Sequence, residues 1–126
     1  GCEKSRMKNT RIIKPWGWYE TINEGHEYLV KIIFVAPNQQ FSLQYHKHRE
    51  ELWSVLEGSG TAIVETPSEL KINSVAVTIG STVTIPKLSI HRMKAGPQGV
   101  KFLEIQRGHI LSEDDIVRLE DDYDRK

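Results

Sequence analysis

Several features are scarce in this sequence, and each scarcity excludes a class of protein. The chain of 126 residues has one cysteine, Cys2, which excludes an intrachain disulfide and a metal site built from several thiolates. Its 17 lysine and arginine residues balance 17 aspartate and glutamate residues, so no overall field attracts it to nucleic acid or to an anionic membrane. Its apolar runs, such as residues 32–36, are far shorter than a bilayer span.

The composition is that of one globular domain. With 38% hydrophobic and 27% charged residues, the chain differs from disordered and membrane-spanning classes, and its length suits a single core. We expect residues 1–10 to be a flexible N-terminus or the remnant of an expression tag, and residues 11–126 to form the domain. The lone cysteine indicates a reducing compartment, so we expect a cytoplasmic protein that binds neither nucleic acid nor membrane.

Short β-prone segments dominate the middle of the chain. Between Trp16 and Gln106, segments rich in Val, Ile, Thr and aromatic residues alternate with Gly, Pro and Asn, a rhythm typical of a β-sandwich or barrel. The predicted strands are residues 18–23, 28–35, 41–48, 52–57, 60–65, 70–77, 82–85, 91–95 and 100–106, separated by turns that include residues 58–60, 66–68 and 96–99. Near the C-terminus, Ser112 precedes three acidic residues, a pattern that predicts a short helical segment.

The third predicted strand gathers potential metal ligands on one face. Its residues alternate strictly, and because successive side chains of a strand point to opposite faces, Gln44, His46 and His48 share a face. Glu51 follows across an expected turn, and His91 begins a later strand. Imidazole, carboxylate and amide groups directed into one barrel would suit a divalent metal ion.

The spacing of these residues resembles a known superfamily. Two stretches carry the resemblance, Gln44-x-His46-x-His48-x-x-Glu51 followed by Gly58, and Gly80-x5-Pro86-x4-His91. They are similar to the two consensus motifs of the cupins, and this implies a double-stranded β-helix, or jelly-roll barrel, that holds one divalent metal ion. The first cupin motif matches best with Gln44, His46 and Glu51 as ligands, joined by His91 from the second. His48 is then an alternative ligand or a catalytic group.

Motifs near both ends of the domain resemble one particular family of cupins. Residues 14–20, 43–49 and 113–123 are similar to the type II mannose-6-phosphate isomerases. In that family a cupin of this size is often the C-terminal domain of a fusion with a mannose-1-phosphate guanylyltransferase. One departure is Leu88, which stands where the second cupin motif usually has glycine, so we expect a differently shaped loop there.

This second resemblance implies an activity. The expected reaction interconverts mannose 6-phosphate and fructose 6-phosphate through a cis-enediolate, in metabolism that supplies polysaccharide precursors. A bound divalent ion would act as a Lewis acid, with zinc expected first and manganese, iron, cobalt or nickel as alternatives. Because cupins of this size commonly pair, the resemblance also implies a homodimer.

Such a reaction needs a base for the substrate proton and cations for its phosphate. We interpret His48 and Glu104 as the candidate bases, since a strand that begins at Val100 would direct Glu104 into the interior. Four basic residues are candidates for binding the phosphate dianion, namely Lys31, Arg92, Arg107 and Arg118.

Two other functions are compatible with the sequence. A non-catalytic cupin would bind a sugar or sugar phosphate without turnover. A metal cupin of other chemistry, such as a dioxygenase, would prefer iron and leave coordination positions open for oxygen. The fold does not choose among these functions, whereas the motifs at both ends of the domain favour the isomerase.

Overall fold

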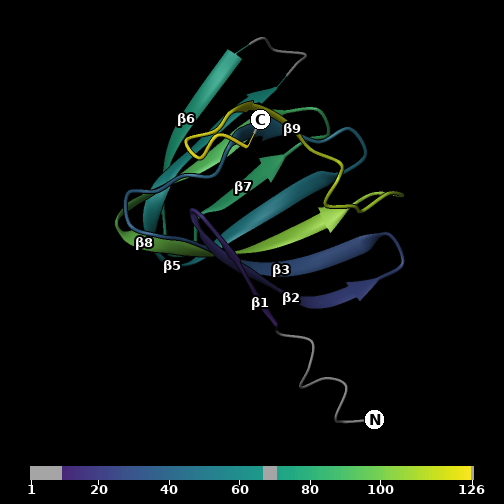
Figure 1. Cartoon of the computed structure of the whole chain (residues 1–126), viewed down its shortest axis with the longest axis horizontal. Coiled ribbons are helices and arrows are strands. Elements are labelled where there is room, and N and C mark those ends of the chain that lie inside the picture. Colours follow the sequence, from purple (N-terminus) through teal and green to yellow (C-terminus); the bar gives the residue numbers. More distant parts are fainter. Residues whose placement is uncertain (1–9, 67–70, 126) are drawn as a thin grey trace.

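The computed structural model describes residues 10–66 and 71–125, and all its regular secondary structure in these ranges is β (Figure 1). The nine strands are β1 (Arg11–Lys14), β2 (Gly17–Gly25), β3 (Tyr28–Val35), β4 (Leu43–Tyr45), β5 (Glu50–Thr66), β6 (Lys71–Thr78), β7 (Thr82–Ile85), β8 (Ile90–Arg107) and β9 (Val117–Glu120). The predicted all-β class is therefore confirmed. Our expectation for residues 1–10 lies outside the described residues except at Thr10, and so does most of the predicted turn at residues 66–68.

Two long strands, β5 and β8, connect the two halves of one curled sheet. Residues 50–58 of β5 pair with residues 100–107 of β8, and residues 60–65 of β5 pair with residues 90–95 of β8. The first half continues from β8 through β3 and β2 to β1, and from β5 to β7. The second half continues from β8 through β4 to β9, and from β5 to β6. Buried side chains from both halves form a single core, as in a jelly roll.

The turns predicted at residues 58–60 and 96–99 are wrong, because β5 and β8 run through both positions. The β5–β8 ladder changes register here, between Gly58 and Gly60. A Cβ atom on Gly58 would lie 2.1 Å from the carbonyl oxygen of Gly99, and Gly58 has a φ of 78°. Glycine is therefore required by the close approach of two strands where the sheet bends, and not by a chain reversal.

The helix predicted after Ser112 is also wrong. The Asp115 N–H donates to the Ser112 carbonyl, and the Asp114 N–H donates to Ser112 Oγ, but these bonds close only a single turn. The chain then enters β9, which pairs with β4. Two of the three acidic side chains that the pattern assigned to a helix N-terminus, Glu113 and Asp115, bind distant parts of the chain instead. No helix in the described ranges is long and apolar enough to cross a membrane.

The inner face of β3, β5 and β8 changes from apolar to polar along its length. Alternate residues of these strands are buried, and at one end they are the apolar Val35, Val55, Val100 and Phe102. Further along the same faces the buried residues are Lys31, Glu51, Glu104 and Gln106. The strand register pairs Lys31 with Glu104, and Glu51 with Gln106. Buried polar groups are costly unless they have partners, so this polar level of the barrel is where a functional site is expected.

Candidate metal centre

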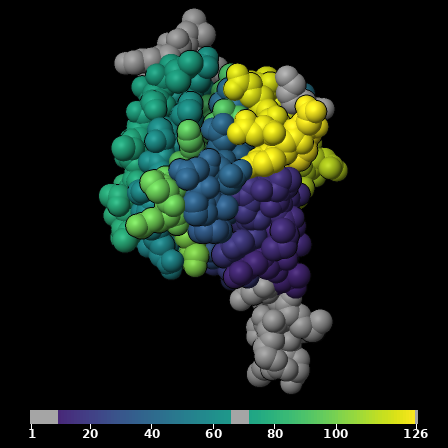
Figure 2. All heavy atoms as spheres, turned by 60° about the vertical axis from the view of Figure 1, so that its left-hand side comes forward, coloured from purple at the N-terminus to yellow at the C-terminus, as the bar shows by residue number. Residues whose placement is uncertain are grey.

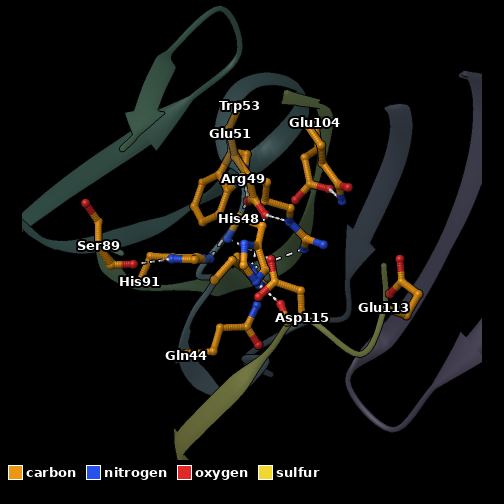
Figure 3. A network of polar contacts seen from close by, with 12 residues as sticks. Gln44, His48, Arg49, Glu51, Trp53, Ser89, His91, Glu104, Glu113 and Asp115 are labelled. Carbon is orange, nitrogen blue, oxygen red and sulfur yellow. Dashed lines mark hydrogen bonds and ion pairs between the residues drawn. The ribbon is translucent and has the colours of Figure 1, made fainter. Parts of the chain in front are cut away.

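Two histidines and a glutamate meet at the polar level of the barrel. His46 follows β4, Glu51 lies in β5 and His91 lies in β8, and all three are buried. Their ligand atoms all lie within 4.8 Å of one another. His46 Nε2 is 3.2 Å from Glu51 Oε2, and His91 Nε2 is 3.8 Å from Glu51 Oε1. Figure 3 shows His91 extending toward the group from the left of the view and Glu51 from the top.

Main-chain carbonyl groups determine which nitrogen of each imidazole carries hydrogen. His91 Nδ1 donates to the carbonyl of Ser89 at 2.8 Å, and His46 Nδ1 donates to the carbonyl of Asp115 at 2.5 Å. Because a carbonyl only accepts, each Nδ1 is protonated and each neutral ring keeps a lone pair on Nε2. His91 Nε2 is buried and has no hydrogen-bond partner among the described residues. Two such lone pairs beside a carboxylate make a donor set for a cation.

The distances between these atoms fit a divalent ion. Ligand atoms bound about 2.1 Å from a tetrahedral ion lie about 3.4 Å apart, close to the 3.2 and 3.8 Å separations here. Gln44 is paired with His91 between β4 and β8, so their side chains share a face. Gln44 Oε1 accepts a hydrogen bond from Ser42 Oγ at 2.6 Å. His46, Glu51 and His91 can therefore hold a metal ion, and Gln44 remains the predicted fourth ligand.

Arg49 belongs to this group, and the sequence analysis missed it. Its Nε donates to Glu51 Oε2 at 3.0 Å and its Nη2 donates to His46 Nε2 at 3.2 Å. The strand predicted over residues 41–48 ends at Tyr45, and the chain bends at the two residues after His46. Strand alternation stops at that bend, so Arg49 turns inward and is buried while His48 is exposed. The structure therefore does not bring His48 into the metal group.

Burial and neighbouring charges shift the ionisation of the candidate ligands in opposite directions. Burial would raise the pKa of Glu51, but the contact with His46 and the nearby His91 and Arg49 outweigh it and hold the pKa well below its usual range. Burial lowers the pKa of His91 to about 4, against the opposing charge of Glu51. At neutral pH the site therefore offers an ionised carboxylate and a neutral imidazole, the forms that bind metals.

Glu104 lies beside the metal group, and its pKa is shifted upward, opposite to that of Glu51. Burial, followed by the charge of Glu51, raises the pKa of Glu104 to about 8, although Arg49 and Lys31 oppose the change. Gln106 Nε2 donates to Glu104 Oε1 at 2.7 Å. A buried carboxyl group with a pKa near neutrality has the property that a general base or acid requires.

A cationic hollow opens next to these residues. Counted with its open mouth, it measures about 680 Å³, and its lining includes Gln44, His46 and Glu104. Five cationic side chains line it, namely Lys14, Lys31, Arg49, Arg118 and Arg125, against two acidic ones, Glu104 and Glu113. The C-terminal residues that form part of this wall pack against the N-terminal strands and the segment near residue 40 (Figure 2). The balance of charge suits an anionic ligand.

The four predicted phosphate-binding residues separate into two pairs. Lys31 and Arg118 line the hollow, where Lys31 forms an ion pair with Glu113 and Arg118 Nε is buried with no hydrogen-bond partner among the described residues. Arg92 and Arg107 do not line it. Each directly follows an inward residue of β8, so alternation turns it outward, and Arg92 instead donates to the carbonyl of Phe41. Sequence reasoning missed Lys14, Arg49 and Arg125, whose inward direction depends on bends and chain ends.

The loop before β8 keeps the backbone geometry of a glycine without having one. Leu88 has a φ of 70°, which lies in the left-handed region that glycine favours. Its N–H donates to the carbonyl of His46, which ties this loop to the metal group. The expected change of loop shape is therefore not supported at Leu88 itself. The substitution instead leaves a branched side chain in a strained conformation.

Comparison with known proteins identifies relatives over most of the chain. A family model described as mannose-6-phosphate isomerase C-terminal matches residues 2–121. The chain is 40% identical over 116 residues to the xanthan biosynthesis protein XanB of Xanthomonas campestris, covering 91% of this chain and 24% of XanB. It is 36% identical over 120 residues to the alginate biosynthesis protein AlgA of Pseudomonas aeruginosa, covering 94% of this chain and 24% of AlgA.

A third relative is named for a guanylyltransferase activity. The mannose-1-phosphate guanylyltransferase RfbM of Salmonella typhimurium is 40% identical over 114 residues, covering 90% of this chain and 22% of RfbM. The chain thus spans about a quarter of the length of these curated relatives.

Solved structures share the fold at low sequence identity. Oxalate decarboxylase from Bacillus subtilis superposes with a TM-score of 0.81 at 17% identity, over 91% of this chain and 31% of that one. The capsular polysaccharide assembling protein CapF from Staphylococcus aureus gives a TM-score of 0.76 at 16% identity, over 88% of this chain and 32% of that one. At these identities the likeness concerns the fold alone, and the predicted cupin fold is confirmed.

Proposed function

Because this chain belongs to the mannose-6-phosphate isomerase C-terminal family, we propose that it is a metal-dependent isomerase that interconverts mannose 6-phosphate and fructose 6-phosphate. The observation that carries the proposal is that three features lie next to one another, with His46 common to the metal group and the hollow. These are a buried His46–Glu51–His91 group, a buried Glu104 with a pKa near neutrality, and a hollow lined mainly by cations. Two of the relatives are named for xanthan and alginate biosynthesis, so we place the activity in polysaccharide precursor supply.

The proposed metal ion is zinc, held by His46, Glu51 and His91, with Gln44 as the fourth ligand. Imidazole nitrogens with a carboxylate are frequent ligands of catalytic zinc. When bound, the ion supplies Lewis acidity that stabilises negative charge on the sugar oxygens. Manganese, iron, cobalt and nickel accept the same ligand types and are alternatives that metal analysis distinguishes.

Glu104 is the proposed base. Its ionised carboxylate would remove the proton from C2 of open-chain mannose 6-phosphate. The C–H electron pair would form the C1–C2 double bond of the cis-enediolate while the π pair of the C1 carbonyl moves onto O1. Return of that proton to C1, with transfer of the C2 hydroxyl proton to O1, would give the C2 ketone of fructose 6-phosphate. A carboxyl group with a pKa near 8 is basic enough to accept a carbon-bound proton and acidic enough to return it.

Arg118 is the proposed anchor for the phosphate. It lines the hollow, and its Nε is buried without a hydrogen-bond partner among the described residues. Guanidinium groups bind phosphate oxygens through paired N–H donors. Lys31 already forms an ion pair with Glu113, and Arg125 with Asp121, so both are partly neutralised. Lys14 adds positive charge at the same wall.

The test is turnover of mannose 6-phosphate by the purified chain after loading with zinc. We expect activity that a chelator removes and that added zinc restores, and we expect none in His46→Ala. A folded chain that binds metal and sugar phosphate without turnover would instead support the non-catalytic sugar-binding function. Activity is to be assayed with each of the alternative metals before that conclusion is drawn.

A further inference from the structure

The segment that precedes β9 contacts a candidate metal ligand through its main chain. His46 is buried, and its Nδ1 donates to the carbonyl oxygen of Asp115 at 2.5 Å. This hydrogen bond keeps the proton on Nδ1, so Nε2 keeps its lone pair, accepts from Arg49 Nη2 and lies 3.2 Å from Glu51 Oε2. The position of one carbonyl group in the C-terminal segment therefore decides how His46 faces the metal group.

The side chain of Asp115 binds the main chain of the two residues that follow His46. The Asp115 carboxylate accepts hydrogen bonds from the main-chain N–H of Lys47 at 2.9 Å and of His48 at 3.0 Å. These residues lie between β4 and β5, outside the strand ladder. Asp115 thus bonds to three consecutive residues, and Figure 3 shows it close to His48.

We propose that Asp115 is a positioning residue for the metal centre. Its carboxylate fixes the main chain of the two residues after His46, and its carbonyl oxygen thereby meets His46 Nδ1 and presents Nε2 to the ion. This inference rests on the proposed metal centre. It gives a function to Asp115, one of the three acidic residues that the sequence pattern assigned to a helix N-terminus.

The rest of the segment is held in place without the Asp115 side chain. β9 pairs with β4, with Arg118 opposite Gln44. Arg92 donates to the main-chain carbonyl of Glu120, and Glu113 forms an ion pair with the buried Lys31. Because these contacts are independent of the Asp115 carboxylate, an Asp115 variant should keep the C-terminal segment docked. The expected defect is then local to His46.

The neighbouring residue offers a matched control. Asp114 is exposed and has the same side chain, but its carboxylate forms no hydrogen bond or ion pair with any described residue. A substitution at Asp114 changes the net charge by the same amount as one at Asp115. A difference between the two variants therefore reports the contacts of Asp115 and not its charge.

The first experiment measures zinc affinity by competition with a chromophoric chelator. We expect Asp115→Ala to weaken zinc binding about 10- to 100-fold, the range typical of residues that orient metal ligands. Asp115→Asn should weaken it less, because the amide oxygen still accepts one of the two N–H groups. Asp114→Ala and Asp114→Asn should bind zinc as the native chain does. Native affinity in both Asp115 variants would overturn the proposal.

The second experiment is independent of metal and of activity. Long-range ¹⁵N–¹H NMR of the metal-free chain reports which imidazole nitrogen carries hydrogen, with the His46 signals identified by their loss in His46→Gln. We expect the Nδ1–H form in the native chain and in Asp114→Ala, and a mixture of tautomers in Asp115→Ala. An unchanged tautomer in Asp115→Ala would overturn the proposal even if zinc binding fell, because the loss would then be a general effect on stability.

The two experiments also separate this inference from the proposed function. Failure of the native chain to bind zinc or any of the alternative metals would refute the metal centre, and with it the positioning function. If the native chain binds zinc and both Asp115 variants bind it with the same affinity, the positioning function alone is refuted. If Asp115→Ala does not fold, Asp115→Asn carries both measurements, and a native affinity and tautomer in that variant overturn the proposal.

Discussion

His91 Nε2 lies 3.8 Å from Glu51 Oε1, and no described residue donates a hydrogen bond to it. The other nitrogen of the ring donates to the carbonyl of Ser89, so Nε2 is a bare lone pair beside a carboxylate. Burial lowers the pKa of His91 to about 4, so protonation does not resolve this contact at neutral pH. Two acceptors held this close in a buried site are stable together when a cation lies between them.

Replacing His91 should therefore remove metal binding with little effect on the rest of the barrel. We expect His91→Ala to weaken zinc binding at least about 100-fold, since loss of a ligand exceeds the effect of losing an orienting residue. Isothermal titration calorimetry with zinc measures the change. His109→Ala is the matched control, because His109 is exposed and forms its ion pair with Glu27. Equal affinity in the two variants would contradict the assignment of His91 as a ligand.

Two variants, Glu104→Gln and His48→Gln, can decide which of these two residues is the catalytic base. Glu104 is buried in the hollow whereas His48 is exposed outside it. Glu104→Gln should lower kcat for mannose 6-phosphate isomerisation by about 10² to 10⁴, the usual contribution of a general base. His48→Gln should retain native kcat. The reverse pattern in the same coupled assay would assign the base to His48.

The raised pKa of Glu104 should also make the metal-free chain less stable as pH rises. Between its ordinary pKa of 4.5 and the folded value of about 8, the folded state holds a proton that the unfolded state has released. The stabilisation is complete below pH 4.5 and is lost as pH rises through about 8, at up to about 1.4 kcal/mol per pH unit. Urea unfolding of the native chain and of Glu104→Gln at pH 5 and pH 8 isolates this contribution. The same loss of stability in both proteins would show that other groups cause it.

Site residues were predictable where strands are regular. Gln44 and Glu104 both lie in strands whose alternation directs them toward the hollow. Local periodicity is enough in such cases, because each side chain's direction is determined by its neighbours in the same strand.

The remaining parts of the site depend on contacts between distant residues. Arg49 is buried because the chain bends after His46, and that bend is held by the Asp115 carboxylate far along the sequence. The run from Ser112 to Asp115 has the local chemistry of a helix N-cap, but pairing of β9 with β4 replaces the helix. Tertiary contacts thus override a valid local preference. The pattern of residues 112–115 alone does not show that the Asp115 carboxylate binds the main chain of Lys47 and His48.

Arg118 should contribute to substrate affinity more than to the chemical step. We expect Arg118→Ala to raise KM for mannose 6-phosphate about 10- to 100-fold, since a charge-assisted hydrogen bond contributes about 1.5–3 kcal/mol. Steady-state kinetics measures KM and kcat separately. Arg107→Ala is the control, because Arg107 is exposed at the end of β8 and does not line the hollow. A native KM in Arg118→Ala would place the phosphate elsewhere in the hollow.

Leu88 offers a way to stabilise the chain by restoring a glycine. Its φ of 70° costs an L-residue about 1 kcal/mol that glycine avoids. The Leu88 side chain is 47% exposed, so its removal loses little buried apolar surface. Leu88→Gly should therefore raise the free energy of unfolding by about 1 kcal/mol and Tm by about 4 °C, as measured by urea and thermal unfolding. Leu88→Ala keeps the Cβ atom that makes this conformation unfavourable, so it should give no such gain. An equal gain in both variants would mean that loss of the exposed leucine, and not relief of backbone strain, is the cause.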